Sequence, residues 1–106
     1  MNSRYMRVIV FFDLPTYTAS DRGDYNKFRK FLIRDGFFMM QESVYCKLAV
    51  NQESANALIL QVKANKPKDG IVQILTVTEK QYANMEFVVG GSKSDVVSTT
   101  ERIIVI

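Results

Sequence analysis

The first constraint on the fold is a strand near the start of the chain that is apolar on both faces. Residues 5–12 read YMRVIVFF, rich in β-branched and aromatic residues, and Asp13-Leu14-Pro15 ends the strand because proline cannot continue a β-ladder. Side chains alternate along a strand, which places Val8 and Val10 on one face and Ile9 and Phe11 on the other. The sheet that contains this strand therefore needs an apolar cover on each side.

The rest of the chain predicts two helices and further strands. The helices are expected over Asp21–Asp35, with Ser20 as N-cap and Gly36 as C′ residue, and over Gln52–Asn65, with Asn51 as N-cap. The strands are expected over Phe37–Met40, Ser43–Val50 and Ile71–Thr78, with a turn or bulge near Gln41 and Glu42. Further strand candidates are Met85–Val89 and Arg102–Ile106.

This β-α-β-β-α-β order predicts an α+β, ferredoxin-like fold, in which both helices cover one face of an antiparallel sheet. The apolar stripe of the first helix comprises Tyr25, Phe28, Leu32 and, at its margin, Phe31. Residues 1–90 are expected to form this domain, and residues 91–106 a flexible segment with a C-terminal β extension. A second copy of the chain is the expected cover of the helix-free face, which gives a face-to-face sheet homodimer.

The composition excludes several kinds of site. The chain has no histidine, which removes imidazole bases, Ser-His and Cys-His pairs and His-ligated metals. Its one cysteine, Cys46, removes internal disulfides and multi-cysteine zinc sites and is expected to be a core residue. No apolar run reaches the roughly 18 residues of a membrane span. We therefore expect a cytoplasmic protein with no membrane partner.

Basic residues concentrate in the first third of the chain. Residues 1–36 carry seven Lys/Arg against four Asp/Glu, and the whole chain has a net charge of +3. Lys27, Lys30 and Arg34 share a helical face opposite the apolar stripe, and Arg22 and Arg7 are further candidates. This pattern predicts contacts with the phosphates of a nucleic acid, without readout of base sequence. The alternative is the solvated face of an amphipathic helix.

Asp13 is the main candidate for metal chemistry. It ends an apolar strand, and pairing of two helix-free faces brings two Asp13 side chains toward each other across the two-fold axis. Two close carboxylates repel unless a proton or a cation lies between them, and Mg²⁺ prefers sparse carboxylate sites completed by water and phosphate oxygens. The alternative is an aspartate that caps the turn before Pro15.

Several short motifs, taken in order, resemble a known family. They are Val8-Ile9-Val10-Phe11-Phe12-Asp13-Leu14-Pro15, Asp35-Gly36-Phe37, Gln41-Glu42-Ser43-Val44-Tyr45 and Leu75-Thr76-Val77-Thr78-Glu79-Lys80-Gln81. Together they are similar to the small CRISPR-associated adaptation protein, the non-integrase partner in spacer acquisition, in its type II version. The resemblance covers about residues 5–91.

The resemblance implies a homodimer that bridges two integrase dimers and holds a double-stranded prespacer DNA, while the integrase performs the transesterification. It implies that Asp13 binds Mg²⁺ at the dimer interface and that Ser43 has a structural or accessory role. The nucleic-acid contacts of Arg22, Lys27, Lys30 and Arg34 are predicted from charge alone.

Two alternatives remain at this point. The resemblance also implies a Mg²⁺-dependent endonuclease acting on single-stranded RNA or double-stranded DNA, with Asp13 as the catalytic residue. The other alternative is a generic regulatory or RNA-binding domain of the same fold, which fold alone does not exclude.

Overall fold

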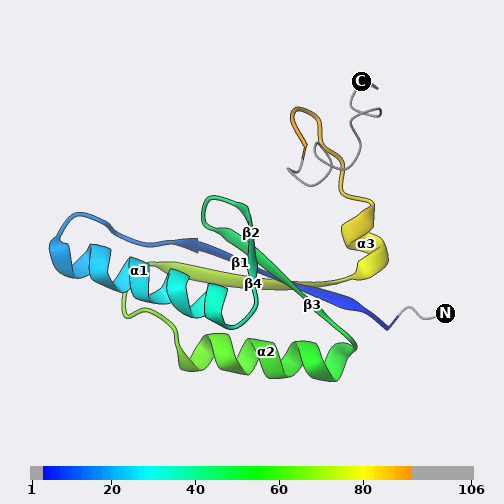
Figure 1. Ribbon diagram of the computed structural model, residues 1–106, viewed down its shortest axis with the longest axis horizontal. Helices are drawn as coiled ribbons and strands as arrows, with labels where there is room; N and C mark the ends of the chain where they lie inside the picture. The colour runs from blue at the N-terminus through cyan, green and yellow to red at the C-terminus, as the bar shows by residue number, and fades with distance from the viewer. Residues whose placement is uncertain (1–3, 92–106) are drawn as a thin grey trace.

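A computed structural model describes residues 4–91 of the chain (Figure 1). Its strands are β1 (Met6–Asp13), β2 (Phe38–Gln41), β3 (Val44–Ala49) and β4 (Ile71–Thr78), and its helices are α1 (Ala19–Arg34), α2 (Gln52–Ala64) and α3 (Glu79–Ala83). Within these residues, no helix combines the length and the apolarity that a membrane crossing requires.

The four strands form one antiparallel sheet in the order β2-β3-β1-β4. The first strand, β1, pairs on both sides, so that Ile9 lies opposite Cys46 of β3 and Leu75 of β4. The two long helices, α1 and α2, lie on the same side of this sheet (Figure 1). The arrangement confirms the predicted α+β fold with ferredoxin-like order.

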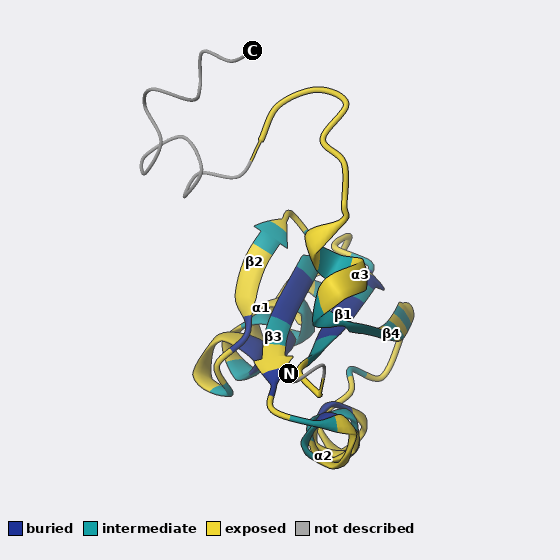
Figure 2. Cartoon of the chain, turned by 90° about the vertical axis from the view of Figure 1, so that its right-hand side faces the viewer, coloured by how far each residue is buried: buried dark blue, intermediate teal, exposed yellow. Residues whose placement is uncertain are grey.

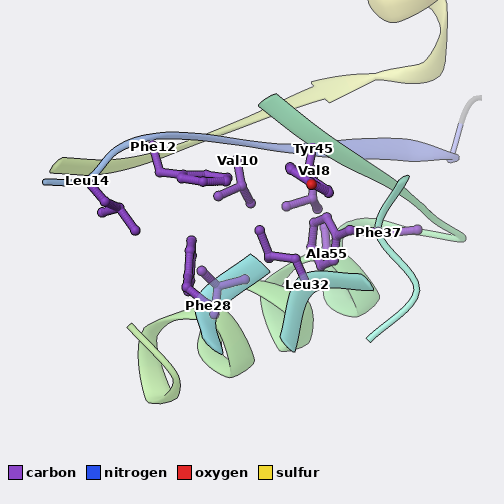
Figure 3. Packing of buried hydrophobic residues seen from close by; sticks show 11 residues of the cluster. Val8, Val10, Phe12, Leu14, Phe28, Leu32, Phe37, Tyr45 and Ala55 are labelled. Carbon is purple, nitrogen blue, oxygen red and sulfur yellow. The ribbon is translucent and has the colours of Figure 1, made fainter. Parts of the chain in front are cut away.

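The core lies between the sheet and the two long helices. Val8, Val10 and Phe12 of β1 are at most 5% exposed and point toward Phe28 and Leu32 of α1 (Figure 3). The rings of Phe12 and Phe28 meet edge to face with their centroids 5.2 Å apart. Burial of each large apolar side chain contributes about 1.5–3 kcal/mol, so these contacts confirm the predicted apolar stripe and hold α1 on the sheet.

The start of α1 differs from the prediction, because Thr18 rather than Ser20 is the N-cap. The Thr18 hydroxyl accepts a hydrogen bond from the amide of Asp21 at 3.0 Å, and the Asp21 carboxylate accepts one from the amide of Thr18 at 3.1 Å. This reciprocal capping box satisfies two amides that lack helical partners. Ser20 has no such partner three residues later, so the helix begins earlier than expected.

The end of the described chain also differs from the prediction. Residues 79–83 form the short helix α3, which Thr78 and Gln81 cap by a second reciprocal pair of hydrogen bonds. The predicted strand over Met85–Val89 is wrong, since these residues pair with no strand and Val88 and Val89 are about nine-tenths exposed. The strand predicted over Arg102–Ile106 lies outside the described residues.

Gly70, at the turn before β4, is expected to be intolerant of any side chain. Its φ of +94° is unfavourable for L-residues, and a Cβ there would lie 2.7 Å from the carbonyl oxygen of Asp13. Gly70→Ala is therefore expected to lower the free energy of unfolding by about 1–3 kcal/mol. Urea denaturation followed by circular dichroism measures this change.

Gly23, inside α1, is the matched control for Gly70. Outside the backbone of its own helix, no atom lies within 4 Å of the position that an alanine Cβ would occupy at Gly23. Its backbone is helical, as in the rest of α1. Gly23→Ala is expected to raise the free energy of unfolding by about 0.5–1 kcal/mol, since alanine loses less entropy in a helix. Equal urea midpoints for Gly70→Ala and Gly23→Ala would contradict the close packing of Gly70 against the carbonyl of Asp13.

Candidate functional site

Asp13 lies at the end of β1, on the sheet face away from α1 and α2. The neighbouring amide, that of Phe12, donates to the carbonyl of Ser43 at 3.1 Å, and Gly70 packs against the Asp13 carbonyl from the other side. The turns before β3 and β4 and the loop before α1 therefore meet at this strand end. Ser43 therefore pairs with Phe12, the residue before Asp13, and lies at the same end of the sheet as Asp13.

The Asp13 carboxylate is exposed and, among residues 4–91, has no hydrogen-bonding or ionic partner. It therefore does not cap the turn before Pro15, which removes the structural alternative for this residue. Within the same residues, no three His, Cys, Asp or Glu side chains gather in a way that would hold a metal ion. Glu42, in the turn before β3, is a second exposed carboxylate at this end of the sheet, but the two do not belong to a group of three.

The notable feature of Ser43 is its backbone conformation. Its φ of 68° lies in the left-handed region, which is uncommon for a residue other than glycine. It occupies the turn between β2 and β3, next to a β-bulge between Met39 and Gln41. This turn joins β2 to β3, and the carbonyl of Ser43 accepts the hydrogen bond from Phe12 beside Asp13.

The outward face of α1 carries the predicted basic residues. Lys27, Lys30 and Arg34 are all exposed. Arg22 differs from them, because its Nη1 donates to the carbonyl oxygens of Thr16 and Tyr17 at 3.2 Å each and so holds the loop before α1. The structure thus brings three of the four predicted cations together and gives the fourth a contact within the chain.

Arg7 lies on the opposite side of the sheet and does not extend the basic face. Its guanidinium binds the Glu79 carboxylate through two donors, at 2.6 and 3.2 Å, and lies 4.2 Å from the centroid of the Tyr82 ring. The hydrogen bond with Glu79 raises the pKa of Arg7. These contacts hold α3 against the sheet, on the side away from α2 (Figure 2).

Cys46 is a core residue, as expected from the sequence. Its side chain is fully buried beneath α3, and its Sγ lies 3.9 Å from Nη1 of Arg7. Burial raises the pKa of the thiol, an effect that Arg7 partly opposes. Burial and the raised pKa both favour the neutral thiol, which is typical of a structural core cysteine.

Beyond α3, the helix-free face of the sheet stays apolar. Leu48, Ile71 and Leu75 are 44%, 57% and 49% exposed, and the strand register places them beside Arg7, Asp13 and Ile9 respectively. Soluble monomers rarely expose large contiguous apolar patches. This face is therefore a candidate interaction surface, with Asp13 at its margin.

Comparison with protein families shows which family this chain belongs to. The family model for CRISPR associated protein Cas2 matches residues 6–85, which span β1 to α3. The chain belongs to the Cas2 family. The resemblance predicted from the strand-end aspartate and the later motifs is thereby confirmed at the level of the family.

Two relatives and one solved structure show how far this Cas2 likeness extends. A CRISPR-associated endoribonuclease Cas2 of Treponema denticola is 50% identical over 101 residues, which cover 95% of this chain and 100% of the relative. A protein of the same name from Streptococcus mutans UA159 is 46% identical over 99 residues, covering 93% and 91%. A crystal structure of Cas2 matches with a TM-score of 0.56 at 26% identity, covering 85% of this chain and 92% of its own.

Two features of this Cas2 chain were missed by the sequence analysis. One is α3, whose capping box, Thr78-Glu79-Lys80-Gln81, was readable as a helix start. The other is the pairing of Arg7 with Glu79, which no sequence signal indicates because the two residues are 72 positions apart. Together they cover one end of the face that was expected to be free of helices.

Proposed function

We propose that this Cas2 chain acts in CRISPR adaptation as a homodimer that bridges two integrase dimers and holds a prespacer duplex by its backbone. The observation that carries the proposal is the separation of two surfaces on opposite sides of one sheet. The helix-free face is apolar, with Leu48, Ile71 and Leu75 exposed, whereas the outward face of α1 is basic.

The apolar face suits a second copy of the chain. Its strands form one antiparallel sheet, so a two-fold axis that runs parallel to the two sheets and between them can place the same side chains against one another. Pairing of this kind buries Leu75 and Leu48, which are roughly half exposed in one chain. Both basic faces of α1 then point outward and remain open to a long polyanion.

The basic face suits the sugar-phosphate backbone rather than the bases. Lys27, Lys30 and Arg34 are exposed cations on one face of a helix, and cations spaced in this way suit the evenly repeated phosphates of a nucleic-acid backbone. A duplex that lies across both copies meets these cations twice. Binding of this kind depends strongly on salt and little on sequence.

The metal proposal depends on the dimer. Within residues 4–91 Asp13 belongs to no group of three acidic or other potential metal ligands, so one chain alone supplies too few ligands for Mg²⁺. Two Asp13 carboxylates from paired chains, completed by water and phosphate oxygens, fit the preferences of Mg²⁺. A bound Mg²⁺ would polarise a phosphodiester and lower the pKa of a water molecule, and Asp13 would hold and orient it.

Cleavage of RNA is the second candidate function. The relatives from Treponema denticola and Streptococcus mutans are both named endoribonucleases. The exposed and unpartnered Asp13 carboxylate supports this function as well, with Asp13 as catalytic residue. The adaptation role comes first because hydrolases that use two metal ions normally hold them in a richer set of ligands than one carboxylate per chain.

Reversal of the charges on α1 is expected to weaken duplex binding. The triple variant Lys27→Glu, Lys30→Glu, Arg34→Glu removes up to three phosphate contacts from each chain and adds repulsion. We expect an affinity loss of about 100-fold or more at moderate salt and a flatter dependence of log K on log salt. Fluorescence anisotropy with a labelled duplex, titrated at several salt concentrations, measures both quantities.

A second triple variant, Lys63→Glu, Lys66→Glu, Lys80→Glu, changes the net charge equally but leaves α1 intact. These three lysines are also exposed, so neither variant disturbs the core. We expect this control to lose much less affinity than the α1 variant. Equal losses would show that net charge, not the face of α1, governs binding, and a strong preference for one duplex sequence would contradict backbone recognition.

A further inference from the structure

The loop between β1 and α1 carries the most exposed aromatic side chain among residues 4–91. Tyr17 is 89% exposed, and the next most exposed aromatic residue, Phe87, is 52% exposed. A ring that stays in water adds nothing to the core. Packing within the chain therefore does not explain why a large aromatic residue stands between the small residues Thr16 and Thr18.

The backbone under the Tyr17 ring is held in place by its surroundings. Leu14 is 8% exposed and anchors one end of the loop, and Thr18 anchors the other end as the N-cap of α1. Between them, Arg22 Nη1 donates to the carbonyl oxygens of Thr16 and Tyr17 at 3.2 Å each. Because the loop is ordered before a ligand arrives, less entropy is lost on binding.

The loop places this ring near the strand end at Asp13. Tyr17 follows Asp13 by four residues, which span at most about 14 Å when fully extended. Nucleotides of a stacked strand advance by about 3.4 Å each. A strand that runs past this end of the sheet therefore reaches the ring within a few nucleotides of Asp13.

We propose that Tyr17 stacks on an unpaired base of a nucleic acid bound at this end of the sheet. The inference rests on the proposed function, because it takes a nucleic acid as the ligand. Within a duplex each base is already covered by its neighbours, whereas a single strand or an unpaired end leaves a base face free for an aromatic ring. Tyr17 thereby adds to backbone binding a preference for single-stranded ends.

Binding of the full chain to a labelled single-stranded DNA, its RNA equivalent and the blunt DNA duplex tests this inference. Tyr17→Ala is expected to weaken binding to both single strands by about 5- to 100-fold, the effect of one stacking contact. Tyr17→Phe keeps the ring and is expected to bind within about twofold of the wild-type chain. Affinity for the blunt duplex is expected to be the same for all three proteins.

Leu60→Ala is the matched control, since Leu60 is a 65% exposed apolar residue on α2, away from this loop. Circular dichroism confirms that each variant is folded. Unchanged affinity of Tyr17→Ala for the single strands overturns the inference, and so does an equal loss on the duplex. A wild-type chain that binds the duplex but no single strand overturns it while leaving the proposed function intact; a chain that binds neither removes both.

Discussion

Prespacer integration by the cognate integrase is expected to fall by about 100-fold or more when this Cas2 chain is left out, and to persist when Asp13→Ala replaces the wild-type chain. A bridge acts by joining two integrase dimers on one duplex, which raises their effective concentration without any chemistry of its own. Asp13 is exposed and unpartnered in one chain, so its loss leaves the apolar face and α1 unchanged. Three parallel reactions with a labelled duplex, analysed for integrated product, measure this.

Glu42 supplies the control for Asp13. It is an exposed carboxylate in the turn beside Ser43, at the same end of the sheet. Glu42→Ala is expected to behave as the wild-type chain in integration. Light scattering must first show that Asp13→Ala is a dimer. If that dimer supports no more integration than a reaction without the chain, the Asp13 carboxylate is required. The metal-dependent cleavage would then replace the bridging role as the leading proposal.

The same proteins separate the second candidate function from the first. If the chain cleaves single-stranded RNA, cleavage is expected to stop in Asp13→Ala and in EDTA and to continue in Glu42→Ala. The two activities then differ in their dependence on one carboxylate, so both can be present in one dimer. Cleavage that survives Asp13→Ala would remove Asp13 as the catalytic residue.

Leu75→Glu is expected to convert the proposed dimer into a monomer. Leu75 is 49% exposed on the helix-free face, opposite Ile9 in the sheet. A carboxylate at this position is well solvated in one chain but would be buried without a partner in a face-to-face dimer, at a cost of several kcal/mol. The dimer dissociation constant should therefore rise by about 100-fold or more.

Light scattering over a range of concentrations measures this dissociation, with 12.1 kDa as the mass of one chain. Leu60→Glu is the matched control, because Leu60 is 65% exposed on α2, outside the proposed interface. We expect Leu60→Glu to remain dimeric. A Leu75→Glu protein that stays dimeric while folded would move the interface to another surface, and a monomeric wild-type chain would remove the dimer.

Much of the fold was predictable because its strands and long helices are encoded locally. The predicted bounds of β4, Ile71–Thr78, agree with the structure, since a turn with Pro67 and Gly70 precedes the strand and a capping box follows it. Asn51 caps α2 as predicted, because its side chain accepts from the amide of Ser54. In each case the signal and its partner lie within a few residues of each other.

The errors arose where two local signals compete or where the partner is distant. Thr18 and Ser20 are both good N-caps, and the choice depends on Asp21 standing three residues after Thr18. The segment that forms α3 is too short for a helical period to show. It is held by Arg7, which is 72 positions away from its partner Glu79.

Some features of the candidate site were also predictable from the sequence, and others were not. Lys27, Lys30 and Arg34 were predictable as one face because helical spacing sets their direction. The freedom of the Asp13 carboxylate was not predictable, since an aspartate before a Leu-Pro turn often caps that turn. Only the folded chain shows that its carboxylate is left without a partner among residues 4–91.

The sequence by itself determined the order of the elements, their amphipathic faces, the basic side of α1 and membership of the Cas2 family. These properties follow from the spacing of residue types along the chain, which acts over a few residues. The tertiary structure alone decided that α3 covers part of the helix-free face, that Arg7 is engaged by Glu79, and that the strand end at Phe12 pairs with the turn at Ser43. Those outcomes depend on contacts between residues far apart in sequence, and local propensity carries no information about which distant groups will meet.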